Sequence, residues 1–367
     1  MVHRVQASIS RSALVHNLRI ARQCANGARV VAVVKADAYG HGLLPVAEAL
    51  QDADLYGVTD IDEAERLRAG GSDKGILILQ GLIERSDITR IAQQGFQVVL
   101  HRPEHLHWLE DVLDNQPPPV PLTFWLKLDS GMGRLGIPPA DYVAAFHALR
   151  AKPWTRDIVL MSHCASASNP DAALNARQLQ HFAATHATLA NHPHSTSVAS
   201  SAILLAFDTL ADWVRPGLML YGNSPFAWQD TGRRREHFAL QAAMTLQARL
   251  LSVKNHPAGD SIGYNEQYVC PRPMRVGIVS IGYGDGYPSG APNHTPVVVH
   301  GQRSGTLGRV SMDMLAVDLS EIPAAQSGDL VTLWGDTLPL DEVAAHTGIL
   351  SYNLTCSLNA RVPRIHV

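Results

Sequence analysis

Short apolar segments alternate with amphipathic segments through the first two thirds of the chain. One amphipathic segment, DIDEAERLRAGG at 60–71, has helical spacing and ends in glycine, as many helices do. Strands that alternate with helices indicate parallel βαβ units, and eight such units close into a TIM-type (β/α)8 barrel of about 250 residues. The pattern therefore predicts an α/β fold that begins with a barrel. Its eight expected strands are 30–34, 55–59, 76–79, 96–100, 122–128, 157–161, 196–199 and 217–221.

Beyond about residue 236 the helical periodicity fades, and β-rich segments separated by turn residues take over. These segments are 244–253, 274–283, 295–300 and 329–335. They predict a mostly antiparallel β domain, with one further helix over 340–348. We therefore expect a barrel over 1–235 and a β domain over 236–367.

The first expected strand, VVAVV, runs directly into Lys35, and a polar, glycine-rich turn with Tyr39 follows it. Barrel enzymes place their chemistry on the loops that follow the strands. An amine held at a barrel mouth can lose solvent, which lowers its pKa and lets it form a Schiff base with an aldehyde such as pyridoxal phosphate. The alternative is a surface lysine whose stem lies along apolar neighbours.

Further polar side chains fall at the ends of the other expected strands or beside them. They are Lys127, Asp129, Arg134, His163, Ser200, Ser201 and Arg215. Arg215 stands just before the eighth expected strand, and Gly217 and Leu218 open it. The loops after strands seven and eight are the usual phosphate site of a barrel. Cations that face a hydroxyl group and backbone amides predict an anionic cofactor, although an ordinary surface ion pair remains an alternative for Arg215.

Composition narrows the possible classes of protein. The chain has 367 residues, 46% of them hydrophobic and 17% charged, so it can bury a large core. A net charge of −3 with interspersed signs argues against a nucleic-acid-binding face. There is no apolar run long enough for a membrane helix, no signal-peptide pattern at the start, and no CxxC pair among the four cysteines. We therefore expect a cytoplasmic protein with free thiols and no membrane partner.

Two motif classes can be set aside. The segment 131–136 matches GxGxxG, but no acidic residue closes a neighbouring strand, so a dinucleotide site is not expected. The histidines His101, His105 and His107 are closely spaced, yet no HExxH or clustered Cys/His pattern accompanies them. We therefore expect no metal site.

The motifs together resemble those of the alanine racemase family, and the resemblance extends over nearly the whole chain. The matching segments, in the order typical of the family, are VVKADAYGHG (33–42), KLDSGMGRLG (127–136), MSH (161–163), DWVRPGLMLYG (212–222), SIGYNEQY (261–268), SIGYGDGYPSG (280–290), GRVSMDM (308–314) and NARVPR (359–364). One departure is Ser200, which precedes Ser201 where family members often have asparagine.

The resemblance implies pyridoxal phosphate on Lys35 and a homodimer, with each active site between the barrel of one subunit and the β domain of the other. It assigns the phosphate to Tyr39, Ser201, Gly217, Leu218 and Tyr352. It places His163 against the cofactor ring and Arg215 at the pyridine nitrogen. It makes Tyr264 the second base and sets Arg134, Tyr283 and Met312 around the substrate. It also implies a carbamylated Lys127, with an unmodified lysine paired with Asp129 as the alternative.

The implied reaction is the interconversion of L-alanine and D-alanine, with Lys35 and Tyr264 acting on opposite faces of the cofactor. Racemisation of another small amino acid such as serine is an alternative, as is a decarboxylase that uses the same cofactor. Arg134 disfavours decarboxylation, because it would hold the carboxylate that must leave. A non-catalytic barrel that carries pyridoxal phosphate is the third alternative, and it would not need the β domain. Biosynthesis of D-alanine for peptidoglycan and alanine catabolism both remain open.

Overall fold

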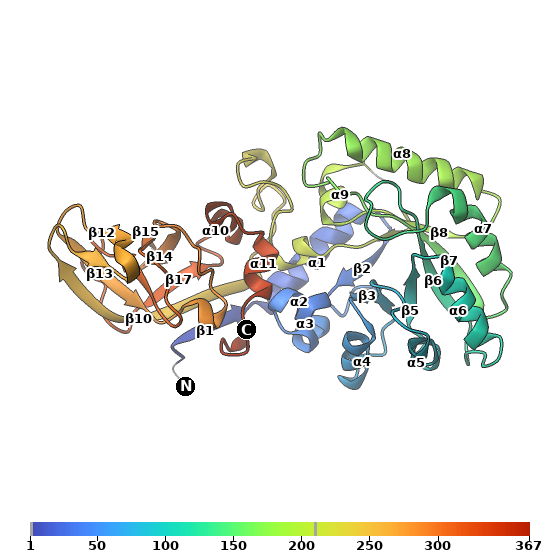
Figure 1. Ribbon diagram of the computed structural model, residues 1–367, viewed down its shortest axis with the longest axis horizontal. Coiled ribbons are helices and arrows are strands. Elements are labelled where there is room, and N and C mark those ends of the chain that lie inside the picture. The colour runs from blue at the N-terminus through green and yellow to red at the C-terminus, as the bar shows by residue number, and fades with distance from the viewer. Residues whose placement is uncertain (1–2, 209–210) are drawn as a thin grey trace. The chain divides into compact units, whose positions relative to one another are not determined.

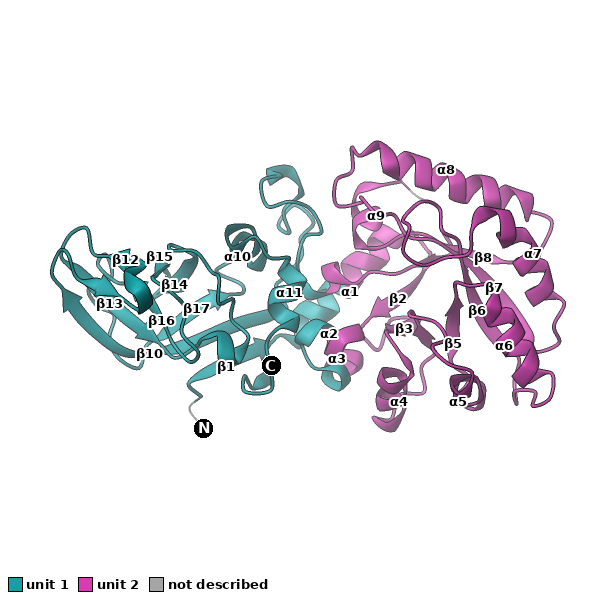
Figure 2. Cartoon of the chain, in the orientation of Figure 1, with its two compact units in different colours: residues 1–17, 39–45, 221–367 teal, residues 18–38, 46–220 magenta. Residues whose placement is uncertain are grey.

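The computed structural model describes residues 3–208 and 211–367, and the chain forms two compact units (Figure 2). Unit 2 comprises residues 18–38 and 46–220, and unit 1 comprises residues 1–17, 39–45 and 221–367. This division differs from the expected boundary after residue 235, because the N-terminal segment and residues 39–45 group with the C-terminal part of the chain.

Unit 2 is built on a parallel sheet with the strand order β8-β7-β6-β5-β4-β3-β2-β9 (Figure 1). A parallel bridge between Ser200 and Arg215, which follow β8 and β9, joins the two ends of this order, so the sheet closes into a barrel. The strands are β2 (Arg29–Val33), β3 (Leu55–Val58), β4 (Ile76–Ile78), β5 (Gln97–Leu100), β6 (Leu122–Lys127), β7 (Thr155–Met161), β8 (Ser195–Ser197) and β9 (Trp213–Val214). The predicted barrel is therefore confirmed.

One helix leads into β2, and further helices connect the successive strands of the barrel. They are α1 (Arg11–Ala25), α2 (Lys35–Gly40), α3 (Leu43–Ala49), α4 (Ile61–Ala69), α5 (Ser86–Gln94), α6 (Glu104–Leu113), α7 (Pro139–Arg150), α8 (Ala173–Thr188) and α9 (Ser201–Ala206). The helix predicted over 60–71 is α4. It begins after Asp60, whose side chain accepts a hydrogen bond from the backbone N–H of Glu63, and Gly70 follows its last residue.

The eighth strand was predicted in the wrong place. Residues Leu218–Tyr221 form a 3₁₀ helix, η1, and the eighth strand is β9 at Trp213–Val214. Pro216 lacks the N–H group that a continuing strand would need for its ladder. Arg215 therefore follows the last strand, at the same position relative to its strand as the other polar groups of the barrel end.

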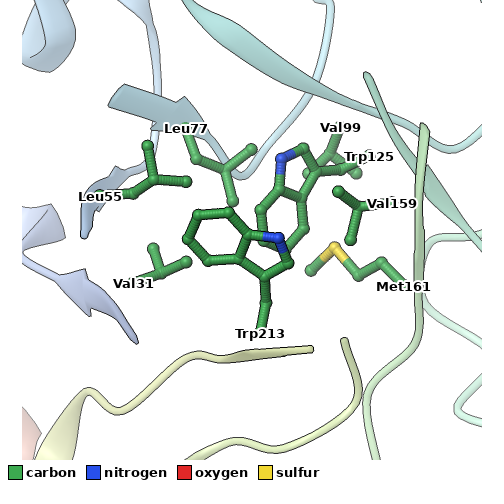
Figure 3. Close-up of a cluster of buried hydrophobic side chains, with 8 residues drawn as sticks. All are labelled: Val31, Leu55, Leu77, Val99, Trp125, Val159, Met161 and Trp213. Atoms are coloured by element: carbon green, nitrogen blue, oxygen red, sulfur yellow. The ribbon is translucent and has the colours of Figure 1, made fainter. Parts of the chain in front are cut away.

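Apolar side chains from seven of the barrel strands fill its interior, as Figure 3 shows. They are Val31, Leu55, Leu77, Val99, Trp125, Val159, Met161 and Trp213. The two tryptophan rings lie 5.6 Å apart between centroids. The barrel is thus a packed core, and its chemistry is confined to the ends of the strands.

Unit 1 contains a sheet with the order β13-β16-β15-β14-β17-β10-β1-β18, in which β13 also pairs with β10. Every pairing is antiparallel except that of β1 with β18, which confirms the predicted β domain. Its strands are β1 (Val5–Ile9), β10 (Met244–His256), β13 (Met274–Val279), β14 (Pro296–Val299), β15 (Gln302–Leu307), β16 (Leu315–Asp318), β17 (Leu330–Trp334) and β18 (Arg364–His366).

Short elements complete unit 1. A two-stranded hairpin pairs β11 (Ser261–Ile262) with β12 (Tyr268–Val269), and helix α10 (Leu340–Thr347) confirms the helix predicted over 340–348. The remaining short helices are η2 (Thr231–Arg233), η3 (Tyr264–Glu266), η4 (Tyr283–Asp285) and α11 (Ser351–Cys356). Across the two described ranges, no helix combines the length and apolar character needed to cross a membrane.

Candidate active site

Five basic side chains gather where the barrel strands end in unit 2. They are Lys35, Lys127, Arg134, His163 and Arg215, and the charges of the other four all act on the imidazole of His163. Burial, followed by the positive charge of Arg215, lowers the pKa of His163 to about 3, so this imidazole is neutral at physiological pH. A group of cations with a neutral imidazole among them suits an anionic ligand that also carries a flat ring.

Lys127 is the last residue of β6, and its side chain is buried. Burial lowers its pKa to about 8, with smaller contributions from Arg215 and Arg134, while Asp129 acts in the opposite direction. Asp129 is engaged elsewhere, because its Oδ1 atom accepts hydrogen bonds from the backbone N–H groups of residues 131, 132 and 133 at 2.9–3.1 Å. This carboxylate therefore folds the loop that carries Arg134, and a large fraction of the Lys127 amine is neutral near pH 8.

Arg215 is buried and firmly oriented. Its guanidinium donates to the Ser197 hydroxyl and, at 2.7 Å, to the backbone carbonyl of Ser162, while its backbone N–H donates to Ala199 at 2.8 Å. Burial lowers its pKa to about 10, which still leaves it charged at neutral pH. Its partners are a hydroxyl and carbonyls within the barrel, so the alternative of an ordinary surface ion pair is wrong.

Three of the residues predicted to bind the phosphate, Ser201, Gly217 and Leu218, lie together after β8 and β9. The Ser201 hydroxyl, at the start of α9, accepts hydrogen bonds from the backbone N–H groups of Gly217 at 2.9 Å and Met219 at 3.4 Å. Leu218 lies between these two donors at the start of η1. A hydroxyl and backbone amides so arranged, close in sequence to Arg215, fit the phosphate of an anionic cofactor.

The turn after Lys35 has an unusual backbone. Ala36, Asp37, Ala38 and Tyr39 all have φ angles of 52–54°, so four successive residues of α2 other than glycine form a left-handed turn. Left-handed helical backbone costs L-residues about 1–2 kcal/mol each. Such strain persists only where surrounding contacts enforce it, and it is concentrated at functional sites.

In unit 1 the structure brings Tyr39 and Tyr352 together. The Tyr39 ring lies 6.4 Å from that of Tyr352 and 4.8 Å from that of Tyr221, measured between centroids. Burial raises the pKa of Tyr39, with smaller effects from Cys356 and Tyr352, so its phenol keeps its proton and can donate a hydrogen bond. Both phenols belong to the set predicted to hold the phosphate.

Three further predicted residues lie on exposed turns of unit 1. The exposed fractions are 64% for Tyr264, 45% for Tyr283 and 53% for Met312. Backbone hydrogen bonds from Tyr283 to Ser311 at 3.1 Å and from Gly284 to Met312 at 2.8 Å join the turns of Tyr283 and Met312. Tyr264 begins η3, a separate turn. All three side chains are therefore accessible on the surface of unit 1.

Comparison with known proteins identifies the family. Residues 9–225 match the model of the alanine racemase N-terminal domain, and residues 243–366 match that of the C-terminal domain. The chain belongs to the alanine racemase family. It is 44% identical over 364 residues to the catabolic alanine racemase of Pseudomonas putida, covering 99% of this chain and 98% of that one.

Solved structures of alanine racemases have the same fold. The biosynthetic alanine racemase of Pseudomonas aeruginosa has a TM-score of 0.92 and 40% identity, covering 100% of both chains. The alanine racemase of Bartonella henselae, described with covalently bound pyridoxal phosphate, has a TM-score of 0.89 and 27% identity, again over 100% of both chains. This chain therefore resembles members described as catabolic and as biosynthetic.

The sequence reasoning missed several residues that organise this racemase-family site. Glu63 accepts a hydrogen bond from the strained turn after Lys35, and Ser197 orients Arg215. Asp285 is fully buried in a glycine-rich segment, GYGDG at 282–286, for which the sequence assigned a role to Tyr283 alone. Its carboxylate accepts hydrogen bonds from the Gly282 N–H at 3.1 Å and from Arg4 at 3.0 Å. An acidic residue within a glycine-rich turn was the one available signal.

Two of the three closely spaced histidines, His101 and His105, have structural roles. His105 is fully buried, and its Nε2 accepts a hydrogen bond from the Arg102 guanidinium at 3.0 Å. His101 is buried too, and its Nε2 lies 3.0 Å from the Gln80 carbonyl. Among the described residues, no group of three or more metal-ligating side chains is placed to hold an ion.

Proposed function

We propose that this protein is a pyridoxal-phosphate-dependent alanine racemase that interconverts L-alanine and D-alanine. The observation that carries the proposal is the position of Lys35. It directly follows the first barrel strand, on a strained left-handed turn, in a group of basic side chains and in a chain of the alanine racemase family. An amine so placed is suited to hold an aldehyde cofactor as a Schiff base.

The residues at the barrel end fit this cofactor. Ser201, Gly217 and Leu218 would hold the phosphate together with Tyr39 and Tyr352. His163 would pack against the ring, and Arg215 would contact the pyridine nitrogen. When bound, pyridoxal phosphate withdraws electrons from the α-carbon of the amino acid, which makes the α-proton removable.

The fixed charge of Arg215 supports racemisation over competing reactions of the same cofactor. An arginine does not give up its proton near neutral pH, so Arg215 would supply no proton to the pyridine nitrogen. Arg215 would thereby limit how strongly the bound cofactor withdraws electrons, which would favour return of the proton to the α-carbon. The orientation of Arg215 by Ser197 and Ser162 supports this role.

Two side chains would move the α-proton. The amine of Lys35 would serve one face of the bound amino acid, and the phenol of Tyr264 would serve the other. Arg134 would hold the substrate carboxylate, which disfavours decarboxylation, while Tyr283 and Met312 would lie around the substrate.

Tyr264 would reach the active site of a second subunit. We propose a homodimer in which each active site is shared, with Tyr264, Tyr283 and Met312 supplied by the partner. The exposure of these three side chains within one chain supports this arrangement. A carrier protein without catalysis would have no use for them.

Lys127 is proposed to be carbamylated. Its pKa of about 8 supplies a neutral amine, which can attack carbon dioxide, form a C–N bond and release a proton. The resulting anion would orient Arg134 and remove a buried positive charge beside Arg215. The hydrogen bonds that Asp129 accepts from its own loop argue against the alternative of a simple Lys127–Asp129 pair.

The test is a panel of L-amino acids incubated with the purified protein and followed by loss of optical rotation. We expect alanine to racemise fastest and serine to racemise more slowly. Faster racemisation of serine would assign the protein to the alternative substrate, and no loss of rotation with any amino acid would contradict catalysis. We also propose a cytoplasmic location, supported by the four free cysteines, and a role either in D-alanine supply for peptidoglycan or in catabolism.

A further inference from the structure

Glu63, on helix α4, connects that helix to the strained turn after Lys35. One carboxylate oxygen, Oε1, accepts a hydrogen bond from the backbone N–H of Asp37 at 3.2 Å. The other, Oε2, accepts one from the backbone N–H of Thr59 at 2.8 Å, just after β3. A single half-buried side chain therefore joins the second barrel loop to the turn that carries the proposed cofactor lysine.

The position of Glu63 is itself fixed. Its backbone N–H donates to Oδ1 of Asp60 at 3.0 Å, which caps α4 at its first turn. The carboxylate thus projects from a rigid helix end and not from a mobile loop. A side chain held in this way can impose a position on the backbone that it binds.

The turn needs an external partner at Asp37. The N–H groups of the first turn of any helix lack acceptors within the helix, and here the N–H of Asp37 donates to the carboxylate of Glu63. The next bond, from Ala38 to the Val34 carbonyl at 2.9 Å, closes the turn on itself. Left-handed backbone at four successive residues persists only where such contacts over-determine it.

We propose that Glu63 is a positioning residue that sets the backbone of the turn so that the amine of Lys35 meets the cofactor aldehyde. The amine forms the C=N bond with the aldehyde carbon and releases water, so its position decides how favourable attachment is. This inference rests on the proposed role of Lys35. It assigns Glu63 no contact with substrate or cofactor.

The test compares two ligands and three variants of the full-length protein. Pyridoxal 5′-phosphate binds through its phosphate, its ring and the bond to Lys35. The probe 4-deoxypyridoxine 5′-phosphate has a methyl group in place of the aldehyde, so it uses only phosphate and ring. The variants are Glu63→Ala, which removes the acceptor, Glu63→Gln, which keeps an acceptor oxygen, and Arg66→Ala. The last is the matched control. Arg66 lies on the same helix as Glu63, and its guanidinium binds the exposed side chain of the same Asp37 at 3.1 Å.

We expect Glu63→Ala to weaken binding of pyridoxal 5′-phosphate about tenfold, the scale of one ordinary hydrogen bond. Its affinity for the deoxy probe should stay within about twofold of the wild type, because Tyr39 is held separately by the rings of Tyr221 and Tyr352. Glu63→Gln should recover part of the loss, because its one amide oxygen can accept from Asp37 while its NH2 group then faces the Thr59 N–H. Arg66→Ala should bind both ligands like the wild type, since exposed ion pairs contribute little.

Three results would overturn the inference. Equal weakening for both ligands would mean that Glu63 maintains the fold of the site as a whole. Unchanged binding of pyridoxal 5′-phosphate by Glu63→Ala would mean that the turn does not depend on Glu63. An Arg66→Ala variant that binds pyridoxal 5′-phosphate as weakly as Glu63→Ala would mean that any contact with Asp37, and not the backbone hydrogen bond to Glu63, sets the turn. Failure of the proposed function would be seen separately, as a wild-type protein that forms no Schiff base on Lys35.

Discussion

At the barrel end, burial, neighbouring charges and hydrogen bonds shift the pKa values of individual residues. Burial and neighbouring cations lower the pKa of Lys127 and of His163. For Asp129 burial opposes ionisation, but three backbone N–H groups and Lys127 outweigh it and lower the pKa of this carboxyl. The site therefore combines a neutral imidazole, an amine that is easily deprotonated and a carboxylate that is ionised at neutral pH.

Asp341, in unit 1, gives a pH-dependent prediction about stability. Burial raises its pKa from 3.8 to about 6, against opposing hydrogen bonds from Ser224 and Ser351. A folded pKa above the unfolded one means that this carboxyl favours folding most at low pH and loses that contribution as pH rises through 6. Asp341→Asn should therefore gain stability relative to the wild type between pH 5 and pH 8, by about 1–3 kcal/mol.

The measurement for Asp341→Asn is the thermal unfolding midpoint of the variant and the wild type at both pH values. The neighbouring substitution Glu342→Gln serves as the control, because Glu342 is the next residue of the same helix and its carboxylate pairs with the exposed guanidinium of Arg303. If the unfolding midpoints of Asp341→Asn and the wild type differ by the same amount at pH 5 and at pH 8, the pKa of Asp341 is not raised by folding.

Single residues differ in how far the sequence predicted them. Lys35, His163 and Ser201 were predicted as site residues because an apolar strand ends just before each of these polar groups, and this pattern is local. Glu63 binds the backbone of Asp37, which is distant in the sequence, so no local pattern predicts its role. Asp285 binds Gly282 within its own turn, but its other partner, the Arg4 side chain, is distant in the sequence. Ser200, the departure from the usual family motif, keeps a structural role through its backbone, which bridges to Arg215.

At the scale of elements, the sequence predicted seven barrel strands and the β-rich segments of unit 1, but it missed three features. The strand β9 has only two residues, and the apolar run after Pro216 forms a 3₁₀ helix, which periodicity cannot distinguish from a short strand. The strand β1 is short, and its pairing with β10 and β18 is visible only in the fold. The left-handed turn has no sequence signature, because residues other than glycine disfavour it.

The joined turns that carry Tyr283 and Met312 give a prediction at this scale. A Cβ atom on Gly282 would lie 2.2 Å from the Ser311 carbonyl oxygen and 2.4 Å from that of Met312. Gly282→Ala must therefore separate the two turns, and overpacking of this kind costs about 1–3 kcal/mol. If both turns contact the substrate, the KM for alanine should rise about tenfold or more, the equivalent of 1.4 kcal/mol.

The control for this prediction is Gly290→Ala. Gly290 belongs to the same glycine-rich segment, but a Cβ atom there would meet no heavy atom within 4 Å. Steady-state kinetics of both variants give the result, and cofactor binding should be unchanged in each. A Gly282→Ala enzyme with the wild-type KM would show that the spacing of these turns does not affect substrate binding.

At the scale of the whole molecule, the proposed shared active site predicts complementation between inactive subunits. Lys35→Ala removes the cofactor lysine from a barrel, and Tyr264→Phe removes the second base from a β domain. A mixed dimer would still hold one site with both groups intact, so random exchange of subunits should restore about a quarter of the wild-type activity. Racemase assays after mixing, with exchange verified by tagged subunits, give the measurement. Continued inactivity of the verified mixed dimers would count against a shared site.

The same two residues give a prediction about the two faces of the bound amino acid. If Lys35 and Tyr264 each move the proton of one enantiomer, loss of one base should affect the two directions of exchange unequally. By the family assignment, Lys35 takes the proton of D-alanine and Tyr264 that of L-alanine. Tyr264→Phe should lose racemisation by about 100-fold or more, the scale of a positioned acid or base.

The overall equilibrium between the enantiomers cannot change in any variant, so the asymmetry has to be read from isotope exchange. In deuterated water, the Tyr264→Phe enzyme should still introduce deuterium at the α-carbon of D-alanine, because Lys35 works alone on that face. L-alanine should exchange far more slowly. Proton NMR of each enantiomer, started from pure material, follows both rates directly. Equal exchange into the two enantiomers would mean that one lysine reaches both faces, and the second base would then be unnecessary.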